Sequence, residues 1–164
     1  MFKKFVIGVP MALLALSTSA AFAESASTSI SITADIPTTA FHAQPVDKEF
    51  GKAEKMQYSI ANGTLSEVRG TFDIRNTTGA VAAYVEGGPA PLFNGNVSQN
   101  IPLSYAFNGT TLTAISQEVV GDDESNGGMR ADLVITANKP TIEQTGLYSA
   151  TPVVVFDALV RTAP

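Results

Sequence analysis

Short runs of alternating apolar and polar residues dominate the sequence after residue 27, with turn-forming residues between them. The clearest run covers residues 28–36 and is ended by Pro37. Its apolar face consists of Ile30, Ile32, Ala34 and Ile36. Alternation with a period of two is typical of a β-strand with one buried face. No segment shows the longer period of an amphipathic helix.

Further alternating runs predict strands at residues 55–60, 67–74, 80–85, 101–107, 110–119, 130–137 and 153–160. The first of these places Met56, Tyr58 and Ile60 on one side. One face of the last consists of Val154, Phe156, Ala158 and Val160. Asn108-Gly109 joins two runs, and such a loop predicts a hairpin because both residues tolerate positive φ. The polar stretch 121–128 is expected to be an exposed loop. Together these elements predict an all-β fold, an antiparallel β-sandwich of immunoglobulin type.

Residues 1–23 have the features of a secretory signal peptide. Lys3 and Lys4 precede an apolar run at residues 5–16, and small residues flank Phe22 at the expected cleavage site. The apolar run is shorter than the about 20 residues that span a bilayer, although a retained membrane anchor is the alternative. We therefore expect the mature chain to begin at Glu24 and to form one domain.

The composition excludes several classes of function. Without the two lysines of the signal, eight basic residues face 15 acidic ones, for a net charge of −7. Because phosphate backbones require clustered positive charge, nucleic-acid binding is not expected, and an anionic membrane surface is disfavoured. The chain has no cysteine, so its stability must come from burial, hydrogen bonds or a partner.

Candidate catalytic and metal-binding residues are few. His42 is the only histidine, and it is interpreted as a packed or exposed side chain on a loop. Asp122, Asp123 and Glu124 form an acidic cluster, but they lack the alternating ligand spacing of a calcium loop. We therefore expect a solvated loop at this cluster, and neither enzymatic activity, a cofactor nor a metal site in the chain.

Three stretches resemble the major pilins of the alternate chaperone–usher class, the colonization-factor or coli surface antigen type of alpha-fimbriae. They comprise residues 30–37, residues 100–109 with the return strand from Leu112, and residues 132–137 followed by 146–149. The resemblance implies an incomplete sandwich that lacks its last strand and leaves an apolar groove. A periplasmic chaperone would fill the groove first. The N-terminal extension of the next subunit would replace it at an outer-membrane usher, by β-strand addition.

The resemblance also implies roles for particular segments. Residues 24–37 would be an N-terminal donor-strand extension and residues 38–164 the pilin domain. The expected donor-strand residues are Ile30, Ile32, Ala34 and Ile36. The expected wall of the acceptor groove, also facing the chaperone, comprises Val154, Phe156, Ala158 and Val160, with plain core as the alternative role. The chain would travel through the periplasm to a surface fimbrium, a head-to-tail homopolymer with a minor tip adhesin.

Two other functions remain open at this point. A monomeric secreted β-sandwich could bind a carbohydrate, with Tyr84, Phe93 and Tyr105 as aromatic platforms. A secreted hydrolase on a β scaffold is the third possibility, and the scarcity of catalytic groups argues against it.

Overall fold

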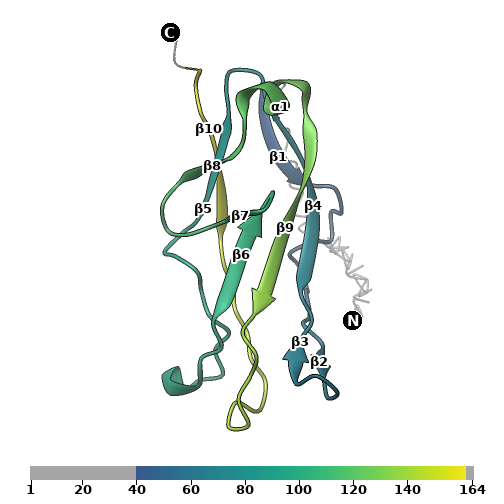
Figure 1. Cartoon of the computed structure of the whole chain (residues 1–164), viewed down its shortest axis with the longest axis vertical. Coiled ribbons are helices and arrows are strands. Elements are labelled where there is room, and N and C mark those ends of the chain that lie inside the picture. Colours follow the sequence, from purple (N-terminus) through teal and green to yellow (C-terminus); the bar gives the residue numbers. More distant parts are fainter. Residues whose placement is uncertain (1–39, 162–164) are drawn as a thin grey trace, which may run out of the picture. The chain divides into compact units, whose positions relative to one another are not determined.

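A computed structural model describes residues 40–161 of the chain (Figure 1). The predicted signal peptide and the predicted strand at 28–36, with its four apolar residues, lie outside the described residues. Within 40–161, none of the helices is long and apolar enough to cross a membrane.

Two antiparallel sheets form most of the fold. The larger sheet has the order β1 (Phe41–Pro45), β4 (Val68–Asn76), β9 (Met129–Ala137), β6 (Leu103–Phe107) and β7 (Thr110–Thr111). The smaller sheet has the order β10 (Val154–Ala158), β5 (Val81–Val85) and β8 (Gln117–Val120). The remaining elements are the hairpin of β2 (Tyr58–Ser59) and β3 (Thr64–Leu65), the 3-10 turn η1 (Val97–Gln99) and the helix α1 (Asp122–Gly127).

The core lies between these two sheets. Along β4, residues Phe72 and Ile74 point inward and alternate with exposed or half-buried ones, and β9 does the same with Ala131 and Leu133. The smaller sheet contributes Val81, Ala83, Val85, Val119 and Val120. The period-two burial predicted from the sequence is therefore confirmed, and so is the all-β, immunoglobulin-like antiparallel sandwich.

The strand predicted at 55–60 is wrong in its extent. Only Tyr58–Ser59 is extended, and it pairs only with the two residues of β3. Met56 packs against the core, but Tyr58 and Ile60 are exposed, so the three residues do not share a buried face. Among the described residues, β2 and β3 form a two-stranded sheet of their own, so no further strand extends the pairing of this hairpin.

The hairpin predicted at Asn108-Gly109 is confirmed, with φ values of 48° and 80°. The long return strand predicted at 110–119 is wrong, because only Thr110–Thr111 pairs with β6. The chain then leaves the larger sheet and joins the smaller one as β8. Leu112 is fully buried at this crossing, which shows that burial between the sheets outweighs continued pairing.

Two segments expected to be loops have regular structure. The polar stretch 121–128 contains α1, and Ser125 on that helix is fully buried. His42 lies in β1, opposite Arg75 of β4, and not on a loop. Neighbouring Phe41 and Ala43 pack against the core, and this packing holds the segment on the sheet edge.

Candidate functional site

The last strand, β10, is an edge strand with one open side. It pairs with β5 from Val154↔Val85 to Ala158↔Val81. Within residues 40–161, no strand pairs with its other side. Such an edge presents backbone donors and acceptors to any extended chain that approaches it.

A cavity of about 1320 Å³ lies beside this edge. Val154 and Phe156 of β10 contribute to one wall, and inward residues of the larger sheet, such as Phe72 and Leu133, contribute to another. Its apolar lining includes Phe50, Met56, Leu65, Val68, Phe72, Leu92, Ile101, Leu103, Leu133, Ile135, Ala150, Val154 and Phe156. We call this space the apolar groove. Because its walls are largely aliphatic and aromatic, it suits apolar side chains more than a polar solute.

Aromatic rings fix the groove wall to the core. The ring centroid of Phe156 lies 4.9 Å from that of Phe107 and 5.5 Å from that of Phe72. Phe50 packs edge-on against Phe72 at 5.8 Å. A side chain at Gly70 would overlap the ring of Phe50, so the glycine provides the space that Phe50 occupies. The contacts of Phe156, edge-to-face with Phe107 and tilted against Phe72, hold β10 to the larger sheet.

The structure separates the four residues predicted for the groove wall. Val154 and Phe156 line the apolar groove and pack against the core. Ala158 is exposed at the end of β10, and Val160 lies beyond the strand with 79% of its surface exposed. Neither of these two is among the residues that line the groove.

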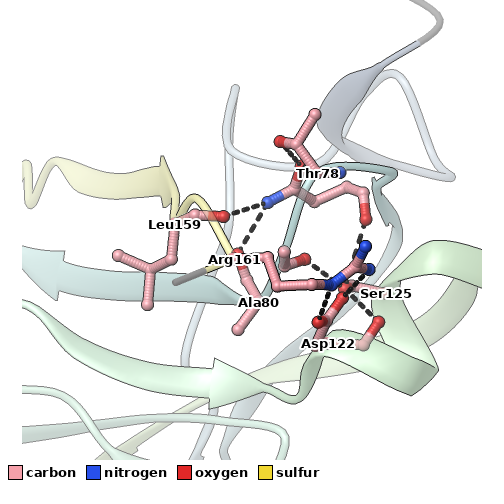
Figure 2. A network of polar contacts seen from close by, with 8 residues as sticks. Thr78, Ala80, Asp122, Ser125, Leu159 and Arg161 are labelled. Atoms are coloured by element: carbon pink, nitrogen blue, oxygen red, sulfur yellow. Dashed lines mark hydrogen bonds and ion pairs between the residues drawn. The ribbon is translucent and has the colours of Figure 1, made fainter. Parts of the chain in front are cut away.

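A buried polar network holds the far end of β10 (Figure 2). Asn76 is fully buried, and its Nδ2 donates to the carbonyl oxygens of Ala80 (2.7 Å) and Leu159 (3.0 Å). Its Oδ1 accepts from the backbone nitrogen (3.1 Å) and hydroxyl (2.8 Å) of Thr78. This one side chain therefore joins the β4–β5 turn to the segment that follows β10.

The helix α1 extends the same network. The hydroxyl of Ser125 donates to the carbonyl oxygen of Gly79 at 2.6 Å. Arg161 forms a two-pronged ion pair with Asp122, at 2.5 and 2.6 Å (Figure 2). Hydrogen bonding from Arg161 lowers the pKa of the Asp122 carboxyl, and Asp122 in turn raises the pKa of Arg161. The acidic cluster thus contributes a structural ion pair.

Charged groups on the larger sheet form further polar contacts. On the larger sheet, Asp132 accepts from Thr71 (2.7 Å) and Arg69 (2.9 Å), and these bonds lower its pKa. Both Asp132 and Arg69 are substantially exposed, so water screens their attraction. No group of three potential metal ligands occurs within residues 40–161.

The three aromatic residues considered for carbohydrate binding, Tyr84, Phe93 and Tyr105, do not form a common exposed surface. Tyr105 is fully buried, and its hydroxyl donates to the carbonyl oxygen of Ala90 at 2.8 Å. Burial raises the pKa of this hydroxyl. Of the other two residues, Phe93 is exposed and Tyr84 is half-buried on β5. A sugar therefore cannot reach Tyr105 in this fold.

Sequence reasoning missed two parts of the site. The loops that complete the groove, around Phe50 and residues 140–152, carry no periodic pattern and gave no signal. Asn76 did offer one, because it continues the inward register of Phe72 and Ile74 along β4. An asparagine at an apolar register position needs internal hydrogen-bond partners.

Comparisons with known proteins give one family match and similar solved structures. Residues 26–157 match the family described as the CS1 type fimbrial major subunit. The structure of the CooA pilin subunit from enterotoxigenic Escherichia coli is similar, with 15% identity and a TM-score of 0.45, over 65% of this chain and 88% of that one. The search of curated protein sequences finds no match.

Proposed function

Because the chain belongs to the family of CS1 type fimbrial major subunits, and is thus a structural subunit of a cell-surface fimbrium and not an enzyme, we propose that it polymerises by donor-strand exchange. The observation that supports this proposal is the open edge of β10 beside an apolar groove. In the exchange, residues 30–36 of one subunit add to the β10 edge of the next.

The donor segment suits the groove in its chemistry. Seven residues of β-strand, from Ile30 to Ile36, extend over about 20 Å. Alternate side chains stand about 7 Å apart on one face, and all four on that face are apolar. Main-chain hydrogen bonds to β10 would supply affinity, and insertion of the side chains between Val154, Phe156 and the larger sheet would set the register.

The energy of this insertion is comparable to the stability of a domain. Burial of one aliphatic side chain contributes roughly 1.5–3 kcal/mol. Three isoleucines and an alanine thus contribute on the order of 5–10 kcal/mol before ordering costs, whereas whole domains are stable by about 5–15 kcal/mol. A subunit with an empty groove is therefore expected to be weakly stable. This expectation underlies the further proposal that a periplasmic chaperone protects the groove until an outer-membrane usher assembles the fibre.

The same proposal gives a role to each segment of the chain. We assign residues 1–23 to the signal peptide, residues 24–37 to the donor extension and residues 38–164 to the pilin domain. Each subunit gives one strand and receives one, so the contact does not close on itself and generates a filament. A minor tip adhesin would end that filament.

A pair of substitutions on the donor segment tests the exchange. Ile32→Asp places a charge on the apolar face, whereas Thr33→Asp places the same charge on the polar face. We expect the processed Ile32→Asp chain to remain monomeric and the Thr33→Asp chain to form polymers, as judged by analytical ultracentrifugation and by electron microscopy. Polymerisation of Ile32→Asp to the wild-type extent would refute donor-strand exchange.

A further inference from the structure

Large aliphatic side chains are exposed at the end of the domain where the groove loops lie. Six such side chains within residues 40–161 are at least three-quarters exposed. Four belong to this end: Ile60 (91%), Val97 (76%), Ile142 (94%) and Leu147 (91%). They come from the β2–β3 hairpin, from η1 and from the loop between β9 and β10, which Figure 1 shows at the same end of the sheets. We call these four residues the apolar end. Ile142 and Leu147 also line the apolar groove, whereas Ile60 and Val97 do not.

Hydrogen bonds join the segments that carry three of these four residues. Nε2 of Gln144 donates to the carbonyl oxygens of Gln99 (3.2 Å) and Asn100 (2.9 Å), which ties the β9–β10 loop to η1. Nδ2 of Asn94 donates to the hydroxyl of Tyr148 at 3.1 Å. The loops that carry Val97, Ile142 and Leu147 are therefore cross-linked to each other. Single exposed apolar residues are common on proteins, but several on a structured surface are typical of an interaction site.

The length of the chain places a neighbouring subunit close to the groove. Only three residues, 37–39, lie between Ile36, the end of the donor segment, and Ala40 beside β1. The four steps from Ile36 to Ala40 reach at most about 14 Å. The domain of the donor subunit must therefore lie directly at the mouth of the groove that holds its strand.

The direction of insertion decides which end that is. Every strand pair in the two sheets is antiparallel, and antiparallel pairing is the more stable kind per residue. A donor strand antiparallel to β10 has its Ile36 end beside Val154, where the β9–β10 loop enters the strand. The donor domain then lies over the apolar end.

The opposite end of the domain is the one that the donor extension leads into, at Ala40. The carbonyl oxygen of Ala40 accepts from the nitrogen of Thr77, and the carbonyl oxygen of Thr78 accepts from the nitrogen of Arg161. The start of the domain and the segment after β10 thus flank one turn. The exposed Val160 lies in that segment.

We propose that the apolar end is a second subunit–subunit contact, which binds the Ala40–Val160 end of the subunit whose strand occupies the adjacent groove. The proposal rests on donor-strand exchange but adds a contact between the folded domains. This contact buries the apolar end in the fibre, and it fixes the orientation of successive subunits more firmly than a three-residue connection does.

The absence of cysteine from the chain allows a direct test. The double variant Leu147→Cys/Val160→Cys is assembled, treated with a short bis-maleimide, and analysed by denaturing electrophoresis after the fibres are unfolded. We expect a ladder of covalent oligomers. The control variant Ile115→Cys/Val160→Cys, in which Ile115 is 75% exposed but belongs to the β7–β8 connection, should give monomers. Fibres that form without the ladder would overturn the second contact and leave donor-strand exchange intact.

A second measurement separates the contact from the exchange itself. Ile60 and Val97 do not line the groove, so the variant Ile60→Ser/Val97→Ser probes the apolar end alone. It should polymerise about tenfold more slowly than wild type, with Ile115→Ser close to wild type. The same two serine substitutions at the apolar end are then introduced into the monomeric Ile32→Asp chain. Binding of a labelled peptide of residues 28–37 to this chain is measured by fluorescence anisotropy. Unchanged peptide affinity supports a contact outside the groove. Equal losses of peptide affinity and of polymerisation would overturn the second contact. If the peptide fails to bind even without the serine substitutions, donor-strand exchange itself is refuted.

Discussion

Replacement of Asn76 by alanine is the sharpest test of how the structure holds β10 in place. The side chain is fully buried and makes four hydrogen bonds, two donated to Ala80 and Leu159 and two accepted from Thr78. The substitution removes all four and leaves the carbonyl oxygens of Ala80 and Leu159 without their side-chain donor. The segment after β10 is then held mainly by Arg161 and by backbone bonds.

The expected loss follows from the number and burial of these bonds. An internal hydrogen bond contributes about 0.5–1.5 kcal/mol net, and a buried group left without a partner costs about 1–3 kcal/mol. We therefore expect Asn76→Ala to lower the free energy of unfolding by about 3 kcal/mol. Asn96→Ala is the matched control, because Asn96 caps η1 through two bonds to Ser98 on the exposed surface. The loss of that cap should cost about 1 kcal/mol or less.

Urea unfolding measures these differences. All variants must be compared at one protein concentration, because association shifts apparent stability. Hydrogen exchange provides a local readout, since the amides of Leu159 and Arg161 donate to Ala80 and Thr78 and should lose protection in Asn76→Ala. If Asn76→Ala were no less stable than Asn96→Ala, the claim that this side chain fixes the end of β10 would be wrong.

Three further predictions concern the same strand and its surroundings. Gly79→Ala should lower the free energy of unfolding by more than about 1 kcal/mol, because the new side chain would overlap the backbone of Leu159. Thermal unfolding measures this loss, and an unchanged midpoint would contradict the prediction. Phe156→Ala should lower the free energy of unfolding by about 2–3 kcal/mol. This is less than the about 3–5 kcal/mol lost with a fully buried ring, because Phe156 is half-buried, and urea unfolding tests the value. The pKa of Asp122 is lowered by Arg161, so this pair stabilises the fold above the unfolded pKa of about 3.9 and loses its effect as the pH falls through the folded value. The stability difference between wild type and Arg161→Gln should therefore shrink between about pH 5 and pH 2, and a constant difference would refute the role of the ion pair.

Local pattern alone determined most of the strands. The alternation in β4, β6 and β9 predicts both their extended backbone and their buried faces, because the period of two is a property of the strand itself. The Asn108-Gly109 turn followed in the same way, from the tolerance of these two residues for positive φ. The resemblance to pilins also rested on such strand patterns, and the family match confirmed it.

The tertiary structure alone decided the features that depend on distant residues. The 110–119 run leaves its sheet because Leu112 is buried at the crossing, and no local pattern reveals that competition. α1 forms in a polar stretch, where Ser125 hydrogen-bonds to Gly79, a residue far away in the sequence. The apolar groove likewise arises where two sheets and two loops meet. Sequence periodicity reports which face of a strand is buried, but the partner that covers that face, and the edge left uncovered, are set by long-range packing.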